Sequence, residues 1–197
     1  MNSMRRHWVS TIITATLLIS LPLKVKSQHC TEDQWNQALT EQHNLDQWYN
    51  QRATRFNRIL GQYQQHIFLH REFTLAELIL LWRSDATEFR TLMEQQITSS
   101  RHYVDIINEE KTLLDNTLPQ IKSLRQMWRQ MGIHCQEIDL NVNALSSHQY
   151  HNTNSTLLND INALLEKLNT LQALYSTEIR ALLTAKELVS AKELAKD

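Results

Sequence analysis

The sequence predicts an all-α protein, an elongated up-and-down bundle of about four long amphipathic helices with coiled-coil-like packing. The chain of 197 residues holds only 2 glycines and 2 prolines, whereas sheet proteins need these residues at frequent turns. Its content of Leu, Gln, Glu and Ala favours long helices. Apolar residues also recur at alternating spacings of three and four along much of the chain, which places them on one face of each helix.

Composition and charge exclude several classes of function. The chain has too few glycines for a phosphate-binding loop of the dinucleotide or P-loop kind. Four of the 20 basic residues and none of the 21 acidic residues fall within residues 1–27, so the rest of the chain is acidic. Because binding to a phosphate backbone needs a basic face, we expect no nucleic-acid partner.

Residues 1–27 have the pattern of a signal peptide. Arg5 and Arg6 precede a short apolar run at residues 8–23, and Ser27 supplies the small residue typical of a cleavage site. The run is shorter than the roughly 20 apolar residues that span a bilayer, and an uncleaved anchor is the alternative. We therefore expect a single helical bundle domain at residues 28–197 of a periplasmic or secreted protein.

The first helix of this domain is predicted to begin after Thr31. Thr31 and Gln34 have the spacing of a capping box, in which each side chain bonds the backbone of the other. The apolar stripe that follows indicates a helix of about 40 residues, or about 60 Å at 1.5 Å per residue.

The most apolar stretch after residue 27 covers residues 67–82 and is predicted to form the tip of a helical hairpin. Thr74 and Glu77 form a second capping box, and Phe73 and Leu78 are spaced as a hydrophobic staple. Either this tip closes one end of the bundle as ordinary core, or it is an exposed patch that docks a partner. Its candidate interaction residues are Ile67, Phe68, Leu69, Phe73, Leu75, Ile79, Leu80 and Trp82.

A second long helix is predicted from Thr74 to about residue 114, followed by a break at residues 115–119. Thr117 can cap a new helix with Pro119 in its first turn, where a missing N–H costs nothing. A single kinked helix that continues through Pro119 is the alternative.

The third and fourth long helices are predicted on either side of a polar loop at residues 146–156. The fourth helix then runs from Leu157 to the end of the chain. A three-helix bundle with a protruding hairpin, or an oligomeric coiled coil, would fit the same pattern. The third helix has a coiled-coil-like seam at Ile121, Leu124, Trp128, Met131, Cys135, Ile138, Val142 and Leu145.

Cys30 and Cys135 are the only cysteines, and an even number in an exported protein favours a disulfide. In an ideal straight bundle, however, Cys135 would lie about 25 Å along the axis from Cys30. A disulfide needs the two Cα atoms within about 7 Å. The intramolecular disulfide is the favoured prediction, and an intermolecular bond or free thiols are the alternatives.

No motif for metal binding or catalysis is found. His66 and His70, or His148 and His151, have a spacing that can bind a transition metal, but chance spacing explains both pairs. The pairs His29–Cys30 and His134–Cys135 could form a zinc site only if their thiols stayed reduced. No Gly-x-Ser-x-Gly and no His-Glu-x-x-His occurs. We therefore predict no enzyme activity, no cofactor and no bound metal.

These observations favour an exported, non-enzymatic helical protein that acts by protein–protein interaction through its apolar hairpin tip. An envelope adaptor, a chaperone and a secretion-system accessory all fit this description. The expected partner is another envelope or secreted protein, or a second copy bound through the helices. The alternative is a membrane-active helical protein whose tip contacts lipid.

Overall fold

A computed structural model describes residues 30–83, 85 and 87–194, so the predicted signal peptide at residues 1–27 lies outside the described residues. The described chain forms helices joined by short connections, which confirms the all-α bundle. It has three long helices and two short ones, where about four long helices were expected. The single helix predicted from Thr74 to about residue 114 is wrong, because one helix ends at Arg83 and another begins at Thr87. The helices are α1 (Glu32–Gln65), α2 (Leu69–Glu72), α3 (Leu75–Arg83), α4 (Thr87–Glu137) and α5 (Asn141–Leu194).

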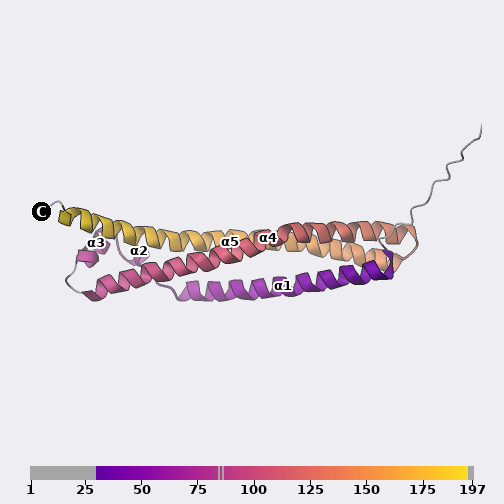
Figure 1. The fold of residues 1–197 in the computed structure, drawn as a ribbon, viewed down its shortest axis with the longest axis horizontal. Helices are drawn as coiled ribbons and strands as arrows, with labels where there is room; N and C mark the ends of the chain where they lie inside the picture. The colour runs from indigo at the N-terminus through magenta and orange to yellow at the C-terminus, as the bar shows by residue number, and fades with distance from the viewer. Residues whose placement is uncertain (1–29, 84, 86, 195–197) are drawn as a thin grey trace, which may run out of the picture.

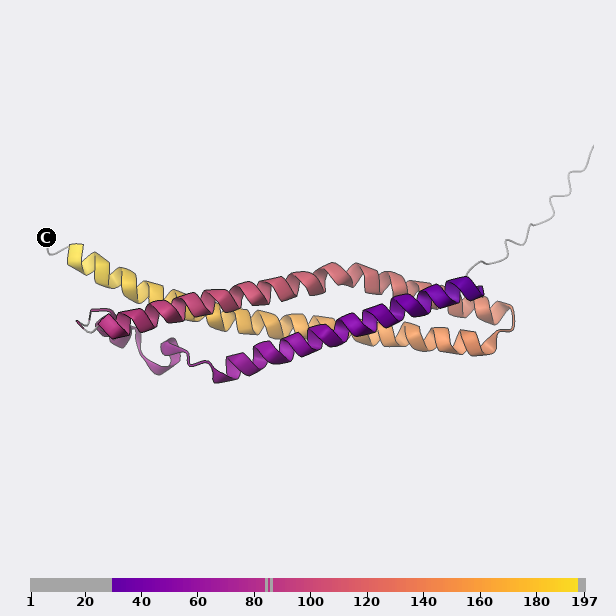
Figure 2. The same ribbon diagram turned by 60° about the horizontal axis from the view of Figure 1, so that its bottom comes forward.

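The long hairpin of α4 and α5 is the frame of the molecule (Figure 1). With 54 residues in α5, this frame is about 80 Å long at 1.5 Å per residue. Helix α1 lies along the half of the hairpin nearest the α4–α5 turn, and α2 and α3 lie along the other half (Figures 1 and 2). The result is an elongated three-helix rod in which α3 takes over the place of α1.

The predicted break at residues 115–119 is wrong, because α4 continues through Pro119. The Thr117 hydroxyl donates a hydrogen bond to the Leu113 carbonyl within the helix, at 2.9 Å, and caps no new helix. Leu114 and Ile121 on either side of the proline are fully buried. Their burial offsets the hydrogen bond that proline removes.

The predicted loop at residues 146–156 is also wrong, since these residues belong to α5. The chain turns earlier, at residues 138–140, in a Schellman motif. The Leu140 N–H donates to the Cys135 carbonyl at 2.9 Å and the Asp139 N–H to the Gln136 carbonyl at 3.2 Å. Asp139 adopts the left-handed conformation of this motif, with φ of 61°. Sequence analysis missed the turn because an aspartate stands where glycine is usual.

The early turn changes the role of the predicted seam of the third helix. Its residues are buried as far as Cys135, whereas Ile138, Val142 and Leu145 are exposed. The polar residues that follow are compatible with a helix because their hydroxyls bond the preceding turn. For example, the Ser147 hydroxyl donates to the Asn143 carbonyl, and the Ser155 hydroxyl to the His151 carbonyl.

Buried apolar residues form two separate clusters. The larger cluster fills the rod between α1, α4 and α5 and includes Leu45, Ile107, Trp128 and Tyr175. The smaller cluster, here called the tip core, joins α3 to the first turns of α4 and the last turns of α5. The tip core consists of Leu78, Trp82, Met93, Ile97, Leu182, Ala185 and Val189.

Polar contacts fix the position of α1 on the hairpin. The Gln42 side chain, only 2% exposed, accepts hydrogen bonds from the Trp128 indole and the Asn154 amide at 2.9 and 2.8 Å. Farther along, Arg52 forms an ion pair with Glu110 at 3.1 Å. Burial raises the pKa of Glu110, and the nearby arginines only partly oppose this. Such buried polar contacts set the register of a helix more than they add stability.

Candidate functional site

Cys30 and Cys135 form an intramolecular disulfide with a Cα–Cα distance of 5.4 Å, which confirms the favoured prediction. The expected separation of about 25 Å arose from the predicted break at residues 115–119, which placed the start of a third helix beside Cys30 and Cys135 well along that helix. Because the chain turns at residues 138–140, Cys135 lies at the end of α4, beside the start of α1. The possible zinc site of the two His–Cys pairs needed reduced thiols, and both cysteines are in the disulfide. His29 of the first pair lies outside the described residues.

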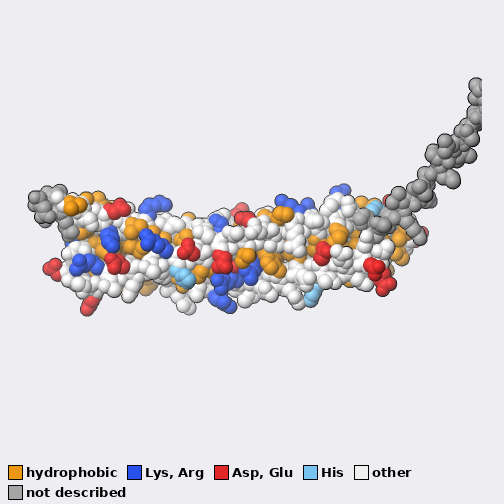
Figure 3. Space-filling model, in the orientation of Figure 1, with side chains coloured by type: hydrophobic (Ala, Val, Ile, Leu, Met, Phe, Trp, Pro, Cys, Tyr) orange, Lys and Arg blue, Asp and Glu red, His pale blue; other side chains and the backbone are white. Residues whose placement is uncertain are grey.

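The predicted interaction tip lies at the opposite end of the rod and divides into an inner and an outer face. Phe68 and Trp82 are buried, at 4% and 5% exposure, and so belong to the core. Leu69 and Ile79 are half-buried. Apolar side chains are visible over the left-hand end in Figure 3. The outer face consists of the four exposed members, Ile67 (68%), Leu80 (63%), Leu75 (45%) and Phe73 (38%).

The inner face attaches α3 firmly to the hairpin. Leu78 and Trp82 are part of the tip core, and the Trp82 indole N–H donates to the Leu182 carbonyl at 3.1 Å. The Lys186 ammonium lies 5.1 Å from the centre of the Trp82 ring. One helix therefore has apolar side chains on two sides, and only one of these sides is covered.

The start of α3 has the predicted capping box. The Thr74 N–H donates to a Glu77 carboxylate oxygen at 2.7 Å, and the Glu77 N–H donates to the Thr74 hydroxyl at 3.3 Å. The hydrogen bond from the Thr74 backbone lowers the pKa of the Glu77 carboxyl. This cap fixes the first turn of α3, and with it the positions of Leu75 and Leu80 on the helix.

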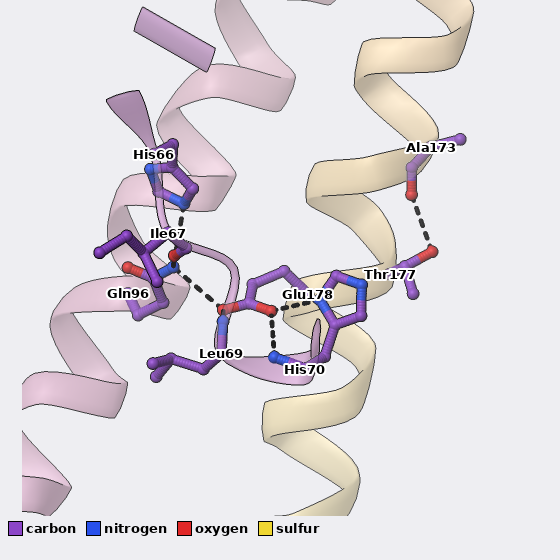
Figure 4. Close-up of polar contacts among 8 residues, drawn as sticks. All are labelled: His66, Ile67, Leu69, His70, Gln96, Ala173, Thr177 and Glu178. Carbon is purple, nitrogen blue, oxygen red and sulfur yellow. Dashed lines mark hydrogen bonds and ion pairs between the residues drawn. The ribbon is translucent and has the colours of Figure 1, made fainter. Parts of the chain in front are cut away.

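Sequence analysis missed Glu178, a buried carboxylate that anchors the connection between α1 and α3 (Figure 4). It projects from α5 and accepts hydrogen bonds from the backbone N–H groups of Leu69 and His70, at 2.8 and 3.0 Å. It also accepts from His70 Nδ1 at 2.5 Å and from the Gln96 amide at 3.0 Å. Glu178 lies three residues after Tyr175 and four before Leu182, both buried, and this spacing in the sequence could have identified it.

Gln96 and His66 complete this polar cluster. The Gln96 amide nitrogen lies within hydrogen-bond distance of the His66 ring, the Ile67 carbonyl and Glu178. The Gln96 amide has only two N–H groups for these three neighbours, so at most two of them accept from it at one time. Burial lowers the pKa of His66, and the opposing attraction of Glu178 is smaller, so the ring is neutral at pH 7.

The hydrogen bonds of this cluster hold the connection between α1 and α3 against α5. The carboxylate of Glu178 already accepts hydrogen bonds from several donors, so its role in this arrangement is to fasten the α1–α3 connection to α5. Within the ranges that the structure describes, no group of three or more His, Cys, Asp or Glu residues could hold a metal ion. None of the described helices is long and apolar enough to cross a membrane.

No protein-family model, no curated protein and no solved structure matches this chain. The functional argument therefore depends on the geometry of the rod and of its two ends.

Proposed function

We propose that this chain is an exported, non-enzymatic protein that binds another envelope or secreted protein through its tip. The observation that carries the proposal is the outer face of the tip, to which α3 contributes Leu75 and Leu80, 45% and 63% exposed. Exposed apolar side chains gathered at one place on a protein often mark a binding surface. An adaptor, a chaperone or a secretion-system accessory would use such a surface.

The way the tip is fastened supports this proposal. Its outer side chains stand on a helix that is held by the tip core, by the capping box and by Glu178. A surface fixed in this way loses little conformational entropy when a partner binds. The disulfide is compatible with an oxidising compartment outside the cytoplasm.

Contact with lipid is the second candidate, since exposed leucine and phenylalanine also enter bilayers. The charges around the tip favour a protein partner over a lipid bilayer. Acidic residues Glu72, Glu77 and Glu88 stand beside basic residues Arg71 and Arg83. A mixed pattern suits a partner with its own charged rim, whereas an anionic bilayer would attract only the basic members.

The test is site-specific photo-crosslinking in living cells, with the reactive group at Leu80. The control position is Glu166, an exposed residue of α5 far from the tip. We expect a discrete crosslinked band from Leu80 that is absent from the control, with the partner named by mass spectrometry. The substitution Leu80→Asp should remove binding to that partner without changing the thermal midpoint of unfolding, because Leu80 is mostly exposed.

Other outcomes would contradict the proposal. A crosslink only to lipid, together with binding of the purified protein to phosphatidylglycerol vesicles, would support the membrane alternative. A crosslink only to a second copy would indicate self-association. If Leu80→Asp unfolded the protein as severely as Trp82→Ala, the outer face of α3 would be core instead of a binding surface.

A further inference from the structure

The end of the rod opposite the tip has its own exposed apolar surface. It surrounds the α4–α5 turn and is here called the turn-end patch. The most exposed members, Val142 (78%) and Leu145 (70%), are three residues apart and so share one face of α5. The turn-end patch consists of Ile133, Ile138, Leu140, Val142 and Leu145, all of which are exposed large apolar residues.

Among the residues that the structure describes, this end carries exposed carboxylates but neither lysine nor arginine. Glu32, Asp33, Glu137 and Asp139 are exposed around the disulfide and the turn. Residues 30–51 and 130–166 contain neither lysine nor arginine, and the nearest basic side chain along α4 is Arg129. Acidic side chains are visible at the right-hand end in Figure 3. The turn-end patch is therefore an apolar surface inside an acidic rim.

A disulfide, aromatic contacts and turn hydrogen bonds hold together the surface beneath the patch. The disulfide ties the start of α1 to the end of α4. The Trp128 ring stacks on Tyr150 at 4.5 Å between centroids and meets the edge of Trp35 at 5.4 Å. The Schellman motif fixes the turn itself. A preformed surface of this kind binds without first having to be ordered.

We infer that the turn-end patch is a second docking surface, and that its occupant is a basic amphipathic helix of a partner protein. The apolar side of such a helix would cover Val142, Leu145 and the turn, and its lysine or arginine side chains would meet the acidic rim. The inference concerns a surface separate from the tip and holds whether or not the tip binds a protein.

The same charges argue against the other occupants. A second copy docked end to end would bring two acidic rims together, which like-charge repulsion disfavours. An anionic bilayer would be repelled in the same way. The experiment tests the second copy and the bilayer separately.

The probe is a synthetic amphipathic helix built from leucine and lysine, compared with a matched helix built from leucine and glutamate. Binding of each to the purified protein is measured by fluorescence anisotropy at low and high salt. We expect the basic helix to bind at least about tenfold more tightly than the acidic one, and salt to weaken its binding. Analytical ultracentrifugation and flotation with phosphatidylglycerol vesicles test the other two occupants.

Two pairs of substitutions locate the binding. Val142→Ser with Leu145→Ser should weaken binding of the basic helix about tenfold, because it removes apolar area from the contact. Glu137→Gln with Asp139→Asn should weaken it by a similar factor at low salt and much less at high salt. Asparagine is chosen at position 139 because it tolerates the left-handed backbone found there. The control is Leu80→Ser at the other end, which should leave binding unchanged.

The inference is overturned if the acidic helix binds equally well, or if Leu80→Ser weakens binding as much as the turn-end substitutions do. It is also overturned if the purified protein instead binds the vesicles or forms a dimer that Val142→Ser with Leu145→Ser abolishes. Unchanged circular dichroism and thermal midpoints show that each variant is folded, as expected for substitutions of exposed side chains.

Discussion

At the residue scale, the two glycines of the chain differ in what surrounds them. A Cβ atom added at Gly132 would lie 3.1 Å from the ring of His148, whereas one added at Gly61 would meet nothing within 4 Å. Gly132 therefore permits a close approach of α4 and α5 near the turn. Gly61 lies in the interior of α1 and has no packing reason to be glycine.

This difference predicts opposite effects of replacing the two glycines. We expect Gly132→Leu to lower the free energy of unfolding by about 1–3 kcal/mol, because it forces the helices apart. Gly61→Ala should raise it by about 0.5–1 kcal/mol through helix propensity alone. Urea denaturation followed by circular dichroism measures both. A stable Gly132→Leu protein would show that His148 moves aside and that the approach is not tight.

His66 predicts a dependence of stability on pH. Burial lowers its pKa in the folded state, so the unfolded chain binds a proton at a higher pH than the folded chain does. Stability is then lost as pH falls through about 6.5, the ordinary pKa of histidine, toward the lower folded value. The chain has nine histidines in all, so the comparison must be made with a variant.

We expect His66→Gln to reduce the loss of stability between about pH 7.5 and pH 5.5, since glutamine keeps a polar side chain beside Gln96 but does not titrate. The measurement is the urea midpoint of each protein at both pH values. His43→Gln, at a mainly exposed position of α1, is the matched control. Equal pH dependence in wild type and His66→Gln would contradict the prediction.

At the element scale, α4 shows that packing can override a local signal. Thr117 and Pro119 together favoured a new helix, yet α4 continues through both for a total of 51 residues. The capping box at Thr74 was predicted correctly, whereas at Thr31 only half of the predicted box forms: the Thr31 hydroxyl accepts from the Gln34 N–H, but the Gln34 side-chain oxygen accepts no hydrogen bond from the described residues. Both caps were recognisable because each depends only on residues three apart. Whether a proline breaks a helix depends on how well the neighbouring turns are buried. The sequence alone does not show which helices those turns pack against.

The same element yields a prediction about Pro119. Its side chain is exposed, so nothing is lost from the core when it is replaced. Pro119→Ala should raise the free energy of unfolding by about 1–3 kcal/mol, because it restores a backbone donor and removes a clash with the preceding turn. Thermal unfolding measures this. No gain would indicate that a bend at Pro119 is needed for α4 to follow α5.

At the scale of the whole molecule, the disulfide joins two cysteines that are 105 residues apart in the sequence. We expect Cys30→Ser with Cys135→Ser to lower the free energy of unfolding by about 2–4 kcal/mol, since the link restricts the unfolded chain. Hydrogen exchange should also become faster in the first turns of α1. Exchange in α3, at the far end of the rod, should change only as much as global stability does. A local loss of protection in α3 would show that the two ends are coupled.

The sequence by itself determined the helical class, the elongated shape, the helix N-caps at Thr31 and Thr74, the disulfide partners and the apolar character of the tip. These follow from composition, from spacings of three and four residues and from residue type, all of which are local. Only the tertiary structure decided where the chain turns, because a Schellman motif with an aspartate has no strong local pattern. That turn brings Cys135 to Cys30 and leaves Val142 and Leu145 exposed. The roles of Glu178 and of the two faces of α3 were likewise decided by which surfaces meet across the bundle, since burial of a side chain depends on its neighbours in space.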